Sequence, residues 1–296
     1  MPVRLIQVPY DSGHRARRMG RGPLHLVAAG ALDRLAAPGE IALVPIEADA
    51  AFATEIGSAF DLHRGVAASV RSACSAGSLP LILSGNCNSA IGTVAGLQAA
   101  GLGEGLGVIW FDGHGDCNTP ETFIGSFLDA LALSTLTGRC WQALAGTVPG
   151  FRPLRDEKVL LLGGHGADPG ARRILADSGI GWEGPEALRC DLEGGALDRA
   201  LARMASLGVS RVYLHLDVDV LDADYAPANG FAPAGGLMPE QLSACVALIL
   251  RRFPVAAAAV APYDPGFDRA DRVRDMALGF LEQVARAAAP PAQTSP

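Results

Sequence analysis

Short apolar runs alternate with longer amphipathic stretches along most of the chain. Most of the apolar runs are continuous, which is typical of strands in a parallel sheet that is buried on both faces. We therefore expect strands at residues 3–10, 41–47, 79–85, 105–114, 158–165, 209–219 and 255–264. The stretches between them predict helices at residues 22–36, 60–77, 89–101, 125–138, 169–179, 195–208, 238–254 and 270–288.

The order of these elements indicates the fold class. Strands that alternate with helices predict βαβ units with right-handed crossovers, and hence a three-layer α/β/α fold with a mainly parallel sheet. We see no linker and no internal repeat, so we expect one domain over residues 1–288 and a disordered tail at 289–296. Polar clusters follow most strands. Because such sheets bind ligands outside the carboxyl ends of their strands, these clusters should meet in one cleft.

Charge and cysteine content exclude several classes of partner. The chain has 296 residues, of which 49% are hydrophobic, and a net charge of −7 without a basic block, so we expect neither nucleic acid nor an anionic membrane as a partner. No apolar run reaches the roughly 18 residues of a membrane span. The six cysteines are scattered, and the first residues do not form a secretory signal. We therefore expect a cytoplasmic protein with free thiols.

The segment "WFDGHGDCNTPET" at 110–122 carries three potential metal ligands, Asp112, His114 and Asp116. Their spacing of two residues would place them on the same side of the chain if the backbone stays extended. Asp217 and Asp219 follow another apolar run with the same spacing.

Together these residues form an oxygen-rich set of ligands. One Asp-x-Asp pair is often a helix cap or a solvated turn, but the five side chains gathered without a cation would suffer repulsion and desolvation. Four carboxylates and one imidazole suit Mn²⁺ better than a structural zinc ion. Because carboxylates can bridge two ions, the set predicts a centre that holds one or two ions and activates a water molecule.

The motifs resemble those of the arginase-like ureohydrolase family, and the resemblance runs nearly end to end. "SGNCNSAIGTVAG" is similar to the family's GGDHSxAxGxxxG, "WFDGHGDCNTPET" to DAHxDxNTPxT, and "GGHGADPG" to the RDxDPxE region. "HLDVDVLDADYAPANGFAPAGGL" is similar to SFDxDxxDPxxxPxxGxPxxGGL. The resemblance implies the arginase/deacetylase α/β/α fold, a homo-oligomer (trimer or hexamer) and a binuclear manganese centre. It also implies hydrolysis of a C–N bond in a small guanidino or amidino substrate.

The resemblance also implies roles for the five ligand candidates. Asp112 and Asp217 would bridge or anchor the ions, while His114 and Asp219 would complete one site. Asp116 would bind the other ion and hold the nucleophile through a hydrogen bond.

The sixth family ligand is a histidine, and Cys87 stands at its position. Three interpretations remain open. Cys87 binds a metal as a thiolate, or it is not a ligand and one site is weak or empty, or the preferred metal is Ni²⁺, Zn²⁺ or Fe²⁺.

Other departures concern the substrate and the proton transfer. Asp129 stands where the family has a histidine that shuttles protons or contacts substrate, and it is either an acid–base group or a charge at a helix surface. Ala259 replaces a glutamate that contacts the guanidinium, and Asp264 or Asp268 would have to supply the charge. Asn118 and Asp168 match positions that bind the carboxylate and amino groups of arginine.

From this pattern we expect a metal-dependent hydrolase whose substrate is not necessarily free arginine; a modified or peptidyl arginine would suit the altered positions. The alternative is a non-catalytic relative with a regulatory role that binds a metal or a guanidino ligand. His215 precedes Asp217 by two residues, so it either faces the same cleft as a ligand or is a hydrogen-bonded core histidine; its apolar neighbours favour the core, and we interpret Cys117 as a core residue.

Overall fold

The computed structural model describes residues 1–35, 40–49, 54–123, 125, 127–190 and 195–288. Eight strands form the central sheet, and every neighbouring pair in it is parallel. In spatial order the strands are β4 (Ile41–Pro45), β1 (Val3–Val8), β5 (Leu79–Ser84), β10 (Val255–Ala261), β9 (Arg211–Asp217), β6 (Leu106–Asp112), β7 (Val159–Gly163) and β8 (Gly181–Glu183). A small antiparallel pair, β2 (Tyr10–Asp11) and β3 (His14–Arg15), lies apart from the sheet.

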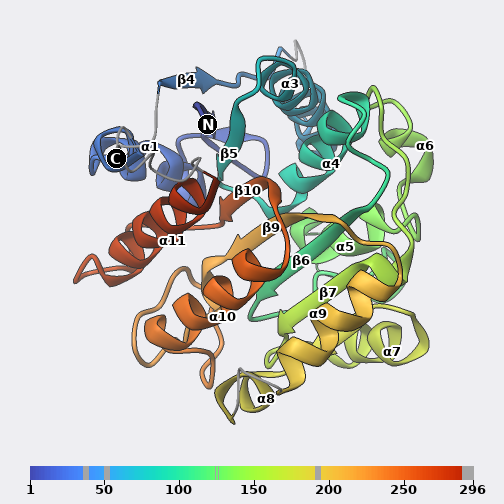
Figure 1. The fold of residues 1–296 in the computed structure, drawn as a ribbon. Helices are drawn as coiled ribbons and strands as arrows, with labels where there is room; N and C mark the ends of the chain where they lie inside the picture. The colour runs from blue at the N-terminus through green and yellow to red at the C-terminus, as the bar shows by residue number, and fades with distance from the viewer. Residues whose placement is uncertain (36–39, 50–53, 124, 126, 191–194, 289–296) are drawn as a thin grey trace, which may run out of the picture.

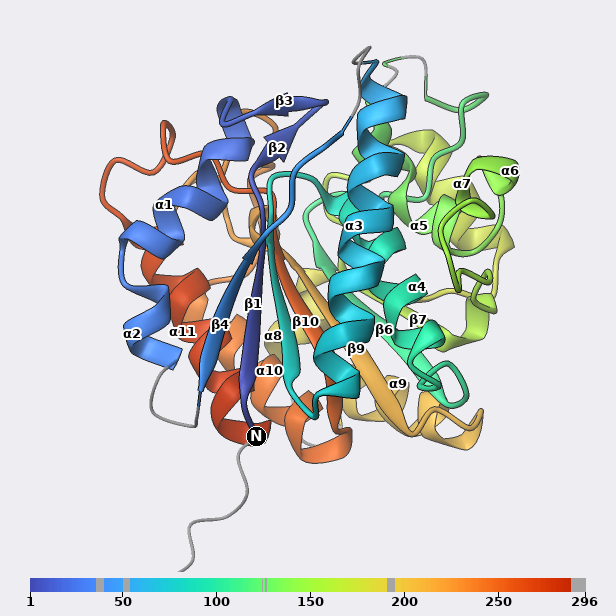
Figure 2. The ribbon, with the colours of Figure 1, turned by 90° about the horizontal axis from the view of Figure 1, so that it is seen from above.

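Helices cover both faces of the sheet (Figures 1 and 2), which confirms the predicted three layers. One face carries α1 (Gly22–Ala28), α2 (Ala31–Leu35), α8 (Pro185–Cys190), α9 (Ala196–Ser206), α10 (Pro239–Arg252) and α11 (Arg272–Ala288). The other carries α3 (Glu55–Ser75), α4 (Ala90–Ala99), α5 (Ala132–Leu136), α6 (Gln142–Ala145) and α7 (Pro169–Asp177). Short 3-10 helices are η1 (Arg18–Arg21), η2 (Cys87–Ser89), η3 (Leu128–Leu131), η4 (Asp156–Lys158) and η5 (Val218–Val220).

Each face of the sheet has its own hydrophobic core. Successive side chains of a strand point to opposite faces, so Ile109 and Phe111 of β6 join one core while Val108 and Trp110 join the other. Both cores are apolar, and this explains why the central strands read as continuous rather than alternating apolar runs.

The boundaries differ from expectation where the chain turns. β6 ends at Asp112 and β7 at Gly163, so the glycine-rich polar segments after them are not strand. The expected helix at 22–36 is two helices separated near Gly30, whose φ of 92° favours glycine. The short β8 and α6 and the six-residue α8 carry too little periodicity to have been predicted. The expected tail at 289–296 lies outside the described residues.

The parallel arrangement brings the polar segments together. The strands β5, β6, β9 and β10 are neighbours and parallel, so their carboxyl ends lie on the same side of the sheet. The segments that follow there are η2, residues 113–118 and η5. No helix within the described residues is long and apolar enough to cross a membrane.

Candidate metal centre

A first group of metal-ligand candidates consists of Asp112, His114 and Asp219. Their ligand atoms all lie within 4.8 Å of one another. His114 Nδ1 is 3.3 Å from Asp219 Oδ2 and 3.6 Å from Asp112 Oδ1. Backbone amides hold the carboxylates, since Gly113 N–H donates to Asp219 Oδ1 at 2.9 Å and His114 N–H donates to Asp112 Oδ1 at 2.6 Å.

The electrostatics of this group favour a positive charge between the carboxylates. Burial lowers the pKa of His114, but the charge of Asp219 and the hydrogen bonds to both carboxylates outweigh it and raise the pKa to about 12. Burial raises the pKa of Asp219, but His114 and the hydrogen bonds prevail and lower it to about 2. The two carboxylates therefore make the position of the His114 imidazole favourable for a positive charge.

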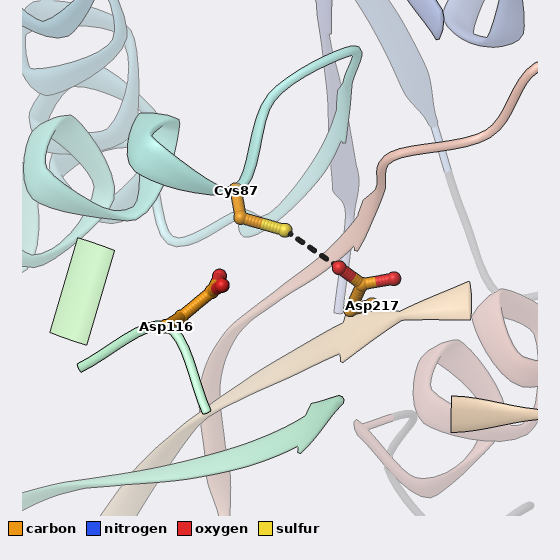
Figure 3. A group of neighbouring side chains, drawn as sticks. All are labelled: Cys87, Asp116 and Asp217. Atoms are coloured by element: carbon orange, nitrogen blue, oxygen red, sulfur yellow. Dashed lines mark hydrogen bonds between the residues drawn. The ribbon is translucent and has the colours of Figure 1, made fainter. Parts of the chain in front are cut away.

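A second group consists of Cys87, Asp116 and Asp217, again with ligand atoms within 4.8 Å of one another. Figure 3 shows the three side chains pointing toward a common space, with the thiol of Cys87 donating to Asp217 Oδ2 at 3.1 Å. Burial, followed by repulsion from neighbouring carboxylates, raises the pKa of each group well above its usual value. Burial and mutual repulsion thus oppose ionisation of all three groups, and a bound cation would offset both effects.

Asp116 supplies a test of whether these residues fit a metal ion. Its Oδ2 is buried and has no hydrogen-bond partner among the described residues. Its backbone has φ of 45°, in the left-handed region that side chains other than glycine rarely adopt. A strained backbone that aims an unpaired carboxylate oxygen at Cys87 and Asp217 fits a cation-binding site. The residues present therefore fit the divalent ions expected from the sequence.

The structure corrects the expectation that Asp112, His114 and Asp116 face the same way. The chain does not stay extended after Asp112, and the turn at Asp116 sends its carboxylate to the second group. Asp217 and Asp219 also separate, because η5 begins between them and Asp219 N–H donates to Asp217 Oδ1 at 2.8 Å. The five predicted residues do meet at one edge of the sheet, together with Cys87.

Asp129 is buried rather than exposed on a helix surface. Asn86 Nδ2 donates to its Oδ2 at 2.6 Å, and the backbone N–H of Asn88 donates to its Oδ1 at 3.0 Å. Burial raises the pKa of Asp129 to about 7, against the opposing effect of these hydrogen bonds. The two asparagines flank Cys87. The segment that carries this ligand candidate therefore also binds the candidate proton carrier, Asp129, through hydrogen bonds.

A cavity of about 520 Å³ opens onto both ligand groups. Asn118 and Asp168 line one part of it and bind each other, because Asn118 Nδ2 donates to Asp168 Oδ2 at 2.6 Å. Asp168 also caps α7 by accepting hydrogen bonds from two backbone amides. The rings of Phe127 and Phe231 stack at 5.6 Å and add an apolar wall, of which Phe231 is 57% exposed.

The residues expected to replace the missing glutamate do not reach this cavity. Ala259 is fully buried in β10. Asp264 accepts a hydrogen bond from Arg21 at 2.6 Å, and Asp268 accepts one from Tyr263 at 2.9 Å; neither lines the cavity. The structure therefore offers no substitute for that charge at these two positions.

Several residues that support the ligand candidates were missed from the sequence. Trp110 Nε1 donates to Asp112 Oδ2 at 3.0 Å, and Asn229 Nδ2 lies 3.5 Å from Asp219 Oδ2. His215 is buried, as expected of a core histidine, yet its Nε2 lies 3.3 Å from the sulfur of Cys87. The contact between His215 and Cys87 joins segments 128 residues apart, so no local sequence pattern signals it. Cys117 is a core residue as expected, and its thiol donates to Ala171 O.

Comparisons with known proteins identify the family and the fold of the chain. The family model described as "Arginase family" matches residues 1–287. The arginase of Bacillus caldovelox is 27% identical over 293 residues, covering 95% of this chain and 96% of that protein. The crystal structure of arginase from Bacillus subtilis has a TM-score of 0.86 at 24% identity and covers 96% of this chain and 98% of that one. The formimidoylglutamase of Bacillus subtilis shares the fold, with a TM-score of 0.76 at 17% identity, over 97% of this chain and 87% of that one.

The family model spans nearly the whole chain, and the matched residues include both groups of ligand candidates. The resemblance drawn from the motifs is therefore confirmed: this chain belongs to the arginase family.

Proposed function

We propose that this chain is a metal-dependent hydrolase that cleaves a guanidino or amidino C–N bond of a small substrate. The observation that carries the proposal is the pair of ligand groups at one end of a cavity large enough for such a molecule. Similarity to arginases over almost the full length supports the same reaction class.

The two groups would hold the ions. Asp112, His114 and Asp219 would bind one ion, and Cys87, Asp116 and Asp217 would bind the other. A divalent ion such as Mn²⁺ supplies Lewis-acid activation of water and substrate. Backbone amides and Trp110 keep the Asp112 and Asp219 carboxylates oriented before any ion binds.

Asp129 would carry the proton. Hydrolysis adds water to the central carbon, breaks a C–N bond and requires a proton on the departing nitrogen. With its pKa raised to about 7 by burial, Asp129 can accept and release a proton at its carboxylate oxygens near neutral pH. The side-chain amide of Asn86 and the backbone N–H of Asn88 fix these oxygens, and Asp129 lines the cavity.

The cavity walls would select the substrate. Asn118 and Asp168 would make polar contacts with the carboxylate and amino groups of a substrate, as the resemblance to arginases implies. Phe127 and Phe231 favour an apolar or planar part of the substrate. Without a glutamate at position 259, the guanidinium loses one charged contact. A modified arginine or another guanidino compound therefore suits the cavity better than free arginine does.

The test is an assay of urea and ammonia release. A panel of arginine, N-hydroxylated and N-acylated arginines, agmatine and formimino compounds would be supplied with the protein loaded with Mn²⁺, Ni²⁺, Zn²⁺ or Fe²⁺. We expect turnover of at least one compound with at least one metal. Tight binding of a guanidino compound without turnover under all conditions would contradict the proposal and favour the regulatory alternative.

Asp129→Asn tests the proton carrier. We expect kcat to fall by about 10²- to 10⁴-fold, because the amide cannot transfer a proton, while metal content stays unchanged. The variant should also lose the part of the pH–rate profile that titrates near the pKa of about 7. Asp264→Asn is the matched control, since Asp264 is a buried carboxylate that does not line the cavity. An unchanged kcat in Asp129→Asn would show that another group moves the proton.

A further inference from the structure

A buried chain of hydrogen bonds leads from Tyr213 to the second ligand group. The hydroxyl of Tyr213 lies 2.7 Å from His215 Nδ1, and His215 Nε2 lies 3.3 Å from Cys87 Sγ. All three side chains are fully buried. Figure 3 shows the same sulfur directed at Asp217, beside Asp116.

The donors and acceptors along this series of hydrogen bonds can be assigned in only one consistent way. The thiol of Cys87 donates its single proton to Asp217 Oδ2 at 3.1 Å, so the sulfur can only accept from His215. His215 therefore carries its proton on Nε2, and Nδ1 accepts from the hydroxyl of Tyr213. In this tautomer the imidazole has one N–H to donate, and that N–H lies 3.3 Å from the sulfur of Cys87.

Packing fixes the orientation of the imidazole. Its ring stacks on Trp110 with centroids 3.6 Å apart and an angle of 8° between the planes. Trp110 lies opposite His215 on the neighbouring strand β6, and Ala259 lies opposite on β10. The stacking on Trp110 thus holds the ring in the orientation in which Nε2 lies beside the sulfur of Cys87.

The alternative is that the buried Tyr213–His215 pair only stabilises the core. Such a pair would satisfy its polar atoms with each other or with the backbone. Here the second ring nitrogen contacts a ligand candidate, and Trp110, which stacks on the ring, donates to Asp112 of the other group. The same two side chains thus support ligands of both groups.

We propose that His215 is a positioning residue that holds the sulfur of Cys87 in place as a metal ligand through an N–H···S hydrogen bond, with Tyr213 fixing the tautomer. Partners of this kind orient metal ligands and strengthen metal binding in other proteins. The inference rests on the metal centre of the proposed function, but not on its substrate or its turnover.

Cobalt provides the test, because Co²⁺ bound to a thiolate has a charge-transfer absorption in the near ultraviolet. We expect this band in the wild-type protein and its complete loss in Cys87→Ser. His215→Phe keeps the stacking on Trp110 but removes the N–H, and we expect the affinity for Co²⁺ at this site to fall by about 10- to 100-fold with a shifted or weakened band. His215→Gln retains an N–H donor and should recover part of both.

His63→Phe is the matched control, since His63 is also fully buried and stacks edge-on against Phe60. It should leave the cobalt band unchanged. Tyr213→Phe removes only a hydroxyl and should lower the affinity for Co²⁺ in the same direction as His215→Phe, but by less. This second variant keeps the inference testable if His215→Phe does not fold. Thermal unfolding of each metal-free variant separates metal binding from stability.

The outcomes distinguish this inference from the proposed function. A cobalt band that is the same in His215→Phe, Tyr213→Phe and wild type overturns the inference, as does a fully active metal-loaded enzyme without any thiolate band. A band that responds to His215→Phe in a protein that hydrolyses no guanidino compound supports the inference and overturns the hydrolase function. A wild-type protein that binds no Co²⁺ overturns the inference, whereas the hydrolase function is decided separately by the turnover assay with Mn²⁺, Ni²⁺, Zn²⁺ and Fe²⁺.

Discussion

Cysteine at position 87 changes the chemistry of the second ligand group. A thiolate is a softer ligand than an imidazole, and it favours Zn²⁺ or Fe²⁺ over Mn²⁺ more strongly than a histidine would. The sulfur lies within 4.8 Å of a carboxylate oxygen of Asp116 and of Asp217, so the structure favours the interpretation in which Cys87 is a ligand. Which metal the group selects stays a prediction.

A different buried residue, His63, should make the stability of the protein depend on pH. Burial, followed by the charge of Arg64, lowers the pKa of His63 to about 3, below its ordinary value of about 6.5. The folded state therefore binds fewer protons than the unfolded state between these two pH values. Stability is retained above about pH 6.5 and is lost as the pH falls toward 3, by up to about 1.4 kcal/mol per pH unit.

Replacing this histidine should remove its contribution. We expect the free energy of unfolding of His63→Phe to fall less steeply between pH 6 and 4 than that of the wild type, as measured by urea unfolding at several pH values. Equal slopes for the two proteins would mean that His63 is protonated in the folded state, contrary to its burial.

At the scale of elements, two helices approach closely enough to require glycine. A Cβ added at Gly92 of α4 would lie 2.5 Å from His63 O in α3, and one at Gly96 would lie 2.6 Å from Ala67 O. α4 continues directly from η2, which begins at Cys87. The close packing of α3 on α4 therefore also sets the position of the segment that carries this ligand candidate.

Gly96→Ala tests this packing. The added methyl group would meet the backbone of α3, which cannot move without displacing the helix, so we expect a loss of about 1–3 kcal/mol in the free energy of unfolding. Gly279→Ala in α11 is the control, because a Cβ there has no neighbour within 4 Å, and it should be neutral or stabilising by up to about 1 kcal/mol. Equal effects of the two substitutions in urea unfolding would argue against close helix contact as the cause.

At the scale of the whole molecule, the parallel sheet gathers four aspartates at the carboxyl ends of its central strands. Asp112, Asp116, Asp217 and Asp219 are all buried there, although the chain separates the first two from the last two by about a third of its length. This arrangement is unfavourable in the absence of cations, because burial and repulsion both oppose ionisation. Folding and metal binding should therefore be coupled.

Addition of Mn²⁺ should stabilise the fold. At a free concentration of 100 times Kd, we expect the free energy of unfolding to rise by about 2.7 kcal/mol for each ion bound, and EDTA should reverse the gain. Asp219→Asn should reduce the gain, whereas Asp264→Asn, outside the cavity, should retain it. Calorimetry with and without metal measures the effect, and a melting temperature insensitive to Mn²⁺ and other divalent ions would contradict a tightly held centre.

The layers of the fold and the chemical type of the site could be predicted from local sequence patterns. Apolar runs separated by amphipathic stretches specify a parallel sheet between helices, because burial of each strand on both faces shows in its composition. The Asp-x-His-x-Asp and Asp-x-Asp patterns identified five ligand candidates, since their residue types and positions at strand ends are local properties.

The grouping of these residues and the side chains that support them follow from packing, which local sequence patterns do not report. The turn at Asp116, with φ of 45°, moved its carboxylate away from His114 and toward Cys87. Asp129 became a buried group because Asn86 and Asn88 bind it across 43 and 41 residues of chain. His215 acquired its contact with Cys87 from the register of strands that are distant in sequence. Periodicity reports which side of an element is buried, whereas contacts between distant segments depend on how the elements pack.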